Sequence, residues 1–104
     1  MIGVEERVPE RDEIELAGML HALSDPVRLQ IVRYLAEVGH EVACGTVPVP
    51  VGKSTISHHY KVLREAGVVR VRDEGTRRFH LLRRDDLEAR FPGLLDAILR
   101  SKSG

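Results

Sequence analysis

The sequence predicts a mainly α-helical domain that carries a single β-hairpin. Apolar residues recur at intervals of three and four over most of the chain, which is the helical period. Residues 69–81 instead alternate apolar and polar side chains around a glycine-containing turn, as the two strands of a hairpin do. With two tyrosines, two phenylalanines and no tryptophan, the core must be built from leucine, valine, isoleucine and alanine, which suits helices.

Two helices are predicted before residue 40. The first covers residues 13–23. The second begins at Ser24-Asp25-Pro26, because a side-chain cap followed by proline favours the first turn of a helix, and it ends at Gly39. Their apolar stripes consist of Leu16, Leu20 and Leu23 in the first helix, and of Val27, Ile31 and Leu35 in the second.

Residues 40–52 are not expected to form a regular helix. Gly45, Pro48, Pro50 and Gly52 interrupt the segment, and prolines at this density do not propagate a helix. We expect a short turn or a distorted helix here, after a brief strand near residues 42–44.

A helix with one apolar and one donor-rich face is predicted over residues 53–67. Ile56, Tyr60 and Leu63 recur at i, i+4 and i+7, and Gly67 tolerates the left-handed conformation that ends many helices. The opposite face carries hydrogen-bond donors and no acid, namely Lys53, Ser54, Thr55, Ser57, His58, Lys61 and Arg64.

The hairpin follows this helix directly. Val69 and Val71 alternate with arginines, the chain turns at residues 73–76, and Phe79 and Leu81 are expected to return on the same apolar face. Its basic residues near the tip are Arg72, Arg77 and Arg78.

A donor-rich helix leading into a basic hairpin is what a winged helix-turn-helix presents to double-stranded DNA. The helix enters the major groove, where Ser54, Thr55, Ser57 and His58 can reach base edges and flanking phosphates. The long arginines of the hairpin, or wing, suit phosphates or a narrow minor groove. The seven donors of the helix and the three arginines of the wing are therefore the candidate DNA-binding residues.

The distribution of charge supports this interpretation. The net charge is zero, but residues 53–84 hold nine basic and three acidic side chains, whereas residues 1–25 hold two basic and seven acidic ones. A segregated positive face is the electrostatic footprint of a phosphate binder. The alternative is that this basic run is only solvated surface.

The apolar residues near the two chain ends predict a homodimer. They exceed what two terminal helices usually bury in so small a domain, and contiguous exposed apolar surface commonly marks an interface. Two-fold symmetry would place the donor-rich helices of the two subunits, the reading helices, on one face of DNA. The alternative is that these residues simply cap the core. They are Leu16, Met19, Leu20, Leu94, Leu95, Ile98 and Leu99.

The chain has 104 residues, which is the size of a single domain. We expect this domain to cover residues 13–100 and to be preceded by a flexible tail of residues 1–12. No stretch approaches the roughly 18 apolar residues of a membrane span, and the acidic start is unlike a signal peptide. The one cysteine, Cys44, cannot form an internal disulfide, which favours the cytoplasm.

Three blocks, LSDPVRLQIVRYL, KSTISHHYKVLREAGVV and VRDEGTRRFHLL, strongly resemble the ArsR/SmtB-type bacterial regulators. The resemblance extends over residues 14–99. It implies a small dimeric winged-helix repressor whose terminal helices pair, whose DNA contacts fall on residues 53–64 and 72–78, and whose DNA affinity is changed by a metal or another effector.

A thiolate or histidine metal site is not expected. Family members that sense arsenic, cadmium or lead use paired cysteines, whereas this chain has only Cys44. Zinc and nickel sensors use histidine on the last helix, and residues 85–100 contain none. Adjacent His58 and His59 lie about 100° apart on a helix, so His58 should face DNA and His59 should pack inward. No cofactor is therefore predicted, although a nickel or zinc effector or a partner protein that senses the signal remains open.

Two other classes of protein are less compatible with the sequence than a DNA-binding regulator. An enzyme would need a nucleophile with its base, paired carboxylates or a phosphate loop, and Gly52-Lys53-Ser54 fails as a P-loop because position 47 is valine. A winged helix used only for protein interaction is disfavoured by the basic, acid-poor helix face. We therefore expect no enzyme activity.

Overall fold

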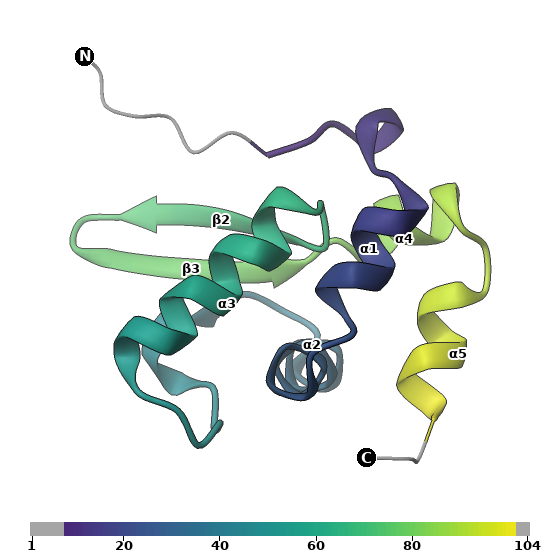
Figure 1. Ribbon diagram of the computed structural model, residues 1–104. Coiled ribbons are helices and arrows are strands. Elements are labelled where there is room, and N and C mark those ends of the chain that lie inside the picture. Colours follow the sequence, from purple (N-terminus) through teal and green to yellow (C-terminus); the bar gives the residue numbers. More distant parts are fainter. Residues whose placement is uncertain (1–7, 102–104) are drawn as a thin grey trace.

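The computed structural model describes residues 8–101, and Figure 1 shows the order of their elements. Five α-helices pack against one side and one end of a small antiparallel sheet. The helices are α1 (Leu16–Ala22), α2 (Pro26–Val38), α3 (Lys53–Glu65), α4 (Arg84–Arg90) and α5 (Leu94–Arg100). The strands are β1 (Val42–Ala43), β2 (Val69–Glu74) and β3 (Arg77–Leu82), and the 3₁₀ turns are η1 (Arg11–Glu13) and η2 (Cys44–Thr46).

Helix boundaries fall where capping chemistry predicts them. The Asp25 carboxylate accepts hydrogen bonds from the backbone N–H groups of Val27 and Arg28 at 2.8 and 3.1 Å, and Pro26 is the first residue of α2. Burial opposes ionisation of Asp25, but the two backbone donors hold its pKa below the ordinary value. Gly39, with φ 78°, ends α2, and Gly67, with φ 85°, lies just beyond α3.

Residues 40–52 follow the expectation of a brief strand and a short turn. β1 pairs with β3, and η2 follows at once, with the Thr46 hydroxyl donating to the carbonyl of Ala43 at 2.9 Å. Beyond the turn the chain runs to Gly52 without regular structure, and Val47 is buried. An irregular segment therefore lies directly before α3.

The sheet has the strand order β1-β3-β2, and its register corrects one prediction. Val69 pairs with Leu82 and Val71 with His80, whereas Arg72 pairs with Phe79. Paired residues share a face, so Phe79 and Leu81 lie opposite the face of Val69 and Val71, and the predicted four-residue apolar face was wrong. The turn connects Glu74 to Arg77, and a register that differs by one residue reverses the facing of a whole strand.

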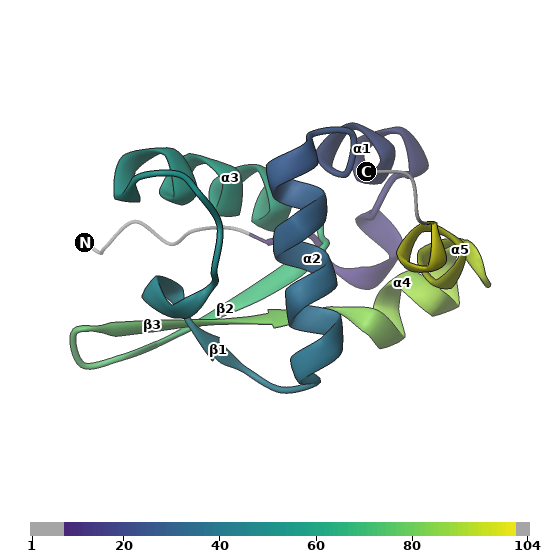
Figure 2. The ribbon, with the colours of Figure 1, turned by 90° about the horizontal axis from the view of Figure 1, so that it is seen from below.

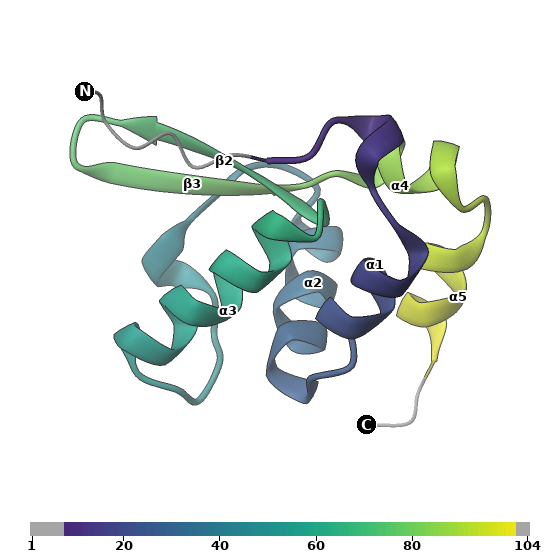
Figure 3. The same ribbon diagram turned by 45° about the horizontal axis from the view of Figure 1, so that its top comes forward.

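The arrangement of the helices separates two ends of the molecule. α2 crosses the centre, between α3 and the C-terminal helices (Figure 2). The N-terminal end of α3 and the tip of the β2–β3 hairpin lie at one end, and α1 and α5 lie toward the other (Figures 1 and 3). The core between them is aliphatic apart from Tyr60 and includes Ile31, Leu35 and Leu63.

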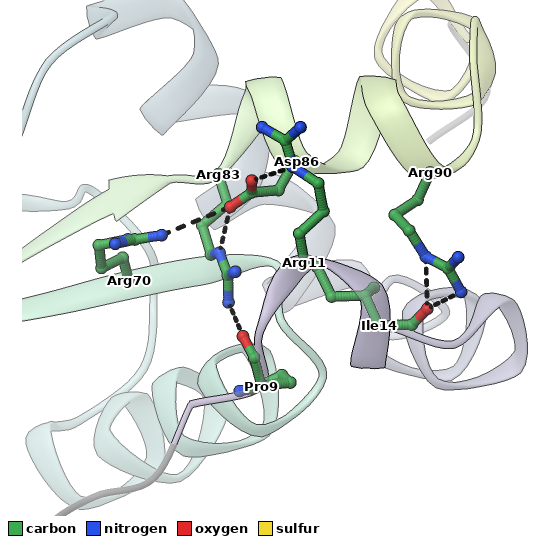
Figure 4. Close-up of polar contacts among 7 residues, drawn as sticks. All are labelled: Pro9, Arg11, Ile14, Arg70, Arg83, Asp86 and Arg90. Atoms are coloured by element: carbon green, nitrogen blue, oxygen red, sulfur yellow. Dashed lines mark hydrogen bonds and ion pairs between the residues drawn. The ribbon is translucent and has the colours of Figure 1, made fainter.

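Residues 8–12 do not form the flexible tail that was predicted for residues 1–12; the earlier part, residues 1–7, lies outside the described residues. The guanidinium groups of Arg83 and Arg90 donate to the carbonyls of Pro9 at 2.7 Å and of Ile14 at 3.0 and 2.6 Å (Figure 4). Arg11 forms an ion pair with Asp86 at 2.7 Å. The first α-helix begins at Leu16 rather than at residue 13, after the 3₁₀ turn η1.

The first prediction concerns Gly67, which lies beneath the N-terminal segment. A Cβ atom there would lie 2.6 Å from Cγ1 of buried Ile14, whereas nothing lies within 4 Å of a Cβ at Gly39, which also has positive φ. Both alanine variants should be destabilised by about 1–2 kcal/mol because of the left-handed backbone. Gly67→Ala should lose about 1–3 kcal/mol more because of overpacking, as measured by urea unfolding. Equal losses in the two variants would exclude a tight contact with Ile14.

The second prediction concerns His80, which is 1% exposed and stacks on Tyr60 with ring centroids 3.7 Å apart. Neither ring nitrogen of His80 has a hydrogen-bond partner among the described residues. Burial above all, with help from Arg64 and Arg78 and against Asp73, lowers the pKa of His80 to about 4. The unfolded chain takes up this proton first as the pH falls.

His80 should therefore reduce stability as the pH falls from about 6.5 to about 4, by up to about 3 kcal/mol. His80→Phe keeps an aromatic ring on Tyr60 and should flatten the pH dependence of the unfolding free energy over this range. His21→Gln, a change at an exposed histidine, should leave the dependence as it is. Urea titrations at several pH values would measure both, and parallel curves for wild type and His80→Phe would contradict the assignment.

Candidate nucleic-acid interface

One face of α3 is exposed and rich in hydrogen-bond donors. The buried positions Ile56, His59, Tyr60 and Leu63 form the opposite face, as their spacing predicts. His59 packs inward and His58 is exposed, in agreement with the sequence analysis. The exposed donors are Lys53, Ser54, Thr55, Ser57, His58 and Lys61.

Arg64 does not belong to this exposed face, so its prediction as a surface donor was wrong. Only 7% of Arg64 is exposed. It follows Tyr60 by four residues, and one helical turn brings it back to the side of α3 that packs against the hairpin. There its charge acts on Asp73 and His80, whose pKa values it lowers.

A buried arginine that was not predicted from the sequence joins α3 to the first two helices. Arg28 of α2 donates from Nε to the carbonyl of Ala22 at 2.7 Å, and its Nη1 lies 3.1 Å from Nδ1 of His59. Since Arg28 carries only donors, this contact requires an unprotonated Nδ1 on His59. The spacing of residues could have predicted its burial. Arg28 precedes Ile31, Val32 and Leu35 by three, four and seven residues, which places it on the apolar face of the helix.

The wing arginines Arg72 and Arg78 are already paired with carboxylates. Arg72 donates to Glu41 at 2.8–3.0 Å and to Glu74 at 2.7 Å. These hydrogen bonds lower the pKa of Glu41 and raise that of Arg72. Arg78 forms an ion pair with Asp73 at 2.7 Å and lowers the pKa of that carboxyl. Both arginines were predicted as DNA contacts, but their acidic partners were not predicted.

Arg77 differs from its two neighbours. Within residues 8–101 no carboxylate pairs with it, and its guanidinium lies 5.1 Å from the centroid of the Phe79 ring. Arg72 lies over the same ring at 4.8 Å. The exposed guanidinium of Arg77 is thus held near the Phe79 ring by cation–π attraction, and its N–H donors face solvent.

The predicted dimer residues divide into two groups. Met19 is 0% and Leu95 1% exposed within a single chain, so both belong to the core and cannot form an interface surface as predicted. Leu16 and Leu20, each 46% exposed, lie one helical turn apart on α1. The half-buried residues of the group are Leu94, Ile98 and Leu99.

The described residues contain neither a metal-ligand cluster nor a membrane span. Within residues 8–101 no three histidine, cysteine, aspartate or glutamate side chains converge as a metal site would require. The Cys44 side chain itself lies outside what the structure describes. No helix of the described chain is both long and apolar enough to cross a bilayer.

Comparisons with known proteins agree with this architecture. A family model described as "Bacterial regulatory protein, arsR family" matches residues 25–71. The uncharacterized HTH-type transcriptional regulator YceK of Bacillus subtilis is 38% identical over 84 residues, 79% of this chain and 84% of YceK. The uncharacterized HTH-type transcriptional regulator MJ1325 of Methanocaldococcus jannaschii is 39% identical over 67 residues, 64% and 75% of the two chains.

A crystal structure has the same fold. The transcriptional repressor BigR of Xylella fastidiosa superimposes with a TM-score of 0.67 at 32% identity, covering 86% of this chain and 87% of BigR. Each of these relatives is named as a transcriptional regulator or repressor rather than as an enzyme. The chain is thus a winged helix-turn-helix protein and belongs to the ArsR family of DNA-binding bacterial transcriptional regulators.

Proposed function

We propose that the chain acts in the cytoplasm as a homodimeric repressor that binds an inverted-repeat operator. One observation carries the DNA contact: the exposed donor face of α3 and the basic hairpin tip lie at the same end of the molecule (Figure 1). A rigid end that carries both elements can contact the major groove and the neighbouring phosphates at once. Repression is proposed because BigR, a structural relative, is named as a repressor.

The N-terminal half of α3 is the part proposed to read bases. Ser54, Thr55, Ser57 and His58 are short or rigid, exposed, and lie within its first two turns. Gly52 precedes the helix without a side-chain cap, so the first backbone N–H groups also suit a phosphate. Lys53 and Lys61 add cations to the same exposed surface.

The wing is proposed to bind phosphates in two different ways. Among residues 8–101, Arg77 has no carboxylate partner to release, so it needs little rearrangement. Arg72 and Arg78 must exchange Glu41, Glu74 and Asp73 for phosphate oxygens, and part of the gain is offset by the breaking of those ion pairs. Arg77 is therefore the wing residue whose removal should reduce DNA affinity most directly.

The first prediction from this function separates the wing from the reading helix. Arg77→Ala should weaken binding to operator and random DNA alike, because phosphates carry no sequence information. It should also reduce the slope of log affinity against log salt by about one for each phosphate that a subunit no longer neutralises. Fluorescence anisotropy at several salt concentrations, with an operator selected from DNA upstream of the gene, would measure both quantities.

Ser57→Ala and His58→Ala are the matched comparison on α3. Each should weaken operator binding by about 1–3 kcal/mol and leave binding to random DNA nearly unchanged. Both side chains are exposed, so neither change should disturb the core. An unchanged salt slope in Arg77→Ala, or an equal loss of affinity for both DNAs in the helix variants, would reverse the assignment.

The second prediction tests the homodimer. Leu16 and Leu20 form an exposed apolar strip on α1. Helix α1 lies beside α5, away from the hairpin tip (Figures 2 and 3). Leu20→Lys should convert a dimer into a monomer at tens of micromolar in sedimentation experiments, because a buried, unpaired ammonium is costly. Gln30→Lys, which adds the same charge at an exposed position of α2, should remain dimeric. A monomeric wild type would refute the proposed interface.

A further inference from the structure

We propose that a pocket at the base of the wing binds a small organic acid, a carboxylate carried on a compact apolar body. The pocket is about 530 Å³ in volume and lies where the C-terminal end of α2, the base of the hairpin and the start of α4 meet. It lies outside the donor face of α3 and the exposed leucines of α1, so it is separate from the surfaces proposed for DNA and for the dimer.

The walls of the pocket combine two kinds of surface. Ala36 of α2 and Leu81 of β3 are partly exposed and supply an apolar wall, with the buried Leu35 and Leu82 behind them. Guanidinium groups line the remainder, from Arg11, Arg70, Arg83 and Arg84. Pockets of 300–1,000 Å³ with apolar walls and a few converging polar groups are the usual form of a small-molecule site.

The charges lining the pocket favour an anion. Four arginines and two carboxylates, Asp85 and Asp86, line the pocket, and Arg84 is already paired with a third carboxylate, Asp96, at 3.0 Å. Asp86 alone is shared by Arg11 at 2.7 Å, Arg83 at 2.9 Å and Arg70 at 3.4 Å (Figure 4). Although burial opposes it, hydrogen bonds from Arg11 and Arg83 lower the pKa of Asp86, so this carboxylate is ionised at neutral pH. One negative charge against three guanidinium groups leaves positive charge for a second anion.

The three arginines around Asp86 differ in how exposed their side chains are and in how firmly hydrogen bonds fix them. The Arg83 side chain is 3% exposed and also donates to the carbonyl of Pro9, so it is fixed. The Arg70 side chain is 56% exposed, and its 3.4 Å contact with Asp86 is the longest of the three. Arg70 can therefore turn its planar donors to an incoming carboxylate without breaking a buried interaction. We assign it as the residue that clamps the ligand.

The apolar wall decides between an organic acid and an inorganic ion. Inorganic phosphate could use the guanidinium groups but would leave the partly exposed Ala36 and Leu81 facing water. A ring or a short branched chain of about six carbons would cover them, and burial of apolar area adds affinity at about 25 cal/mol per Å². An acid of this kind satisfies both kinds of wall.

Benzoate is a suitable probe, with its neutral isostere benzamide and inorganic phosphate as comparisons. In ¹H–¹⁵N NMR titrations of the intact protein without DNA, benzoate should shift the amides of Gly39 and of residues 81–86 saturably. Benzamide should shift them much less. Ala36→Leu, which fills the pocket and keeps every charge, should weaken benzoate binding and leave the fold intact, because leucine is a good helix former.

Arg70→Gln and Arg77→Gln form the matched pair of charge variants on the hairpin. Arg70→Gln should raise the benzoate dissociation constant about tenfold, which corresponds to about 1.4 kcal/mol. Arg77→Gln, at the far tip, should leave it unchanged. The inference is overturned if benzoate gives no saturable shifts at tens of millimolar, if benzamide binds equally well, if phosphate binds and benzoate does not, or if the two variants lose affinity equally.

Discussion

The position of α3 depends on a buried contact that leaves the helix little freedom to move. Ile56, Tyr60 and Leu63 fill the space between α2 and the hairpin, and Arg28 sends a charged group into the same interior. A buried guanidinium is tolerated only when its donors are used, and here they reach the end of α1 and His59 on α3. A shift of α3 would expose apolar surface and leave the buried guanidinium of Arg28 without its partner on this helix. The donor face of α3 is therefore held at a fixed angle.

The position of the hairpin depends on α3 as well. Gly67 turns the chain from α3 into β2, and the segment from Pro9 to Ile14 closes over that junction. Asp86 and Arg83 then tie this segment to the hairpin base and to α4. Reading helix, wing and N-terminal segment are therefore one mechanical unit, although they come from distant parts of the chain.

Much of this architecture could be predicted from local chemistry. Asp25-Pro26, Gly39 and Gly67 mark element ends because capping and left-handed backbone need particular residues. The glycines and prolines of residues 40–52 likewise predicted that this segment would not form a regular helix. These signals require only neighbours in sequence.

Features that depend on contacts across the fold could not be predicted in this way. The hairpin register placed Phe79 and Leu81 on the unexpected face because a difference of one residue reverses side-chain alternation. Arg64 was taken for a surface donor because composition does not tell which side of α3 the wing covers. Met19 and Leu95 were assigned to an interface because only the packed structure tells a core leucine or methionine from an exposed one.

The stack of Tyr60 on His80 has an optical consequence. The chain contains no tryptophan and two tyrosines, so its near-ultraviolet absorption and emission come almost entirely from Tyr34 and Tyr60. Tyr34 is partly buried on α2, whereas Tyr60 lies against an imidazole ring at the joint between α3 and the wing. The protein thus carries an intrinsic chromophore at the joint that fixes the angle between its two DNA-facing elements. Loss of this stack on unfolding can be followed there without an attached label.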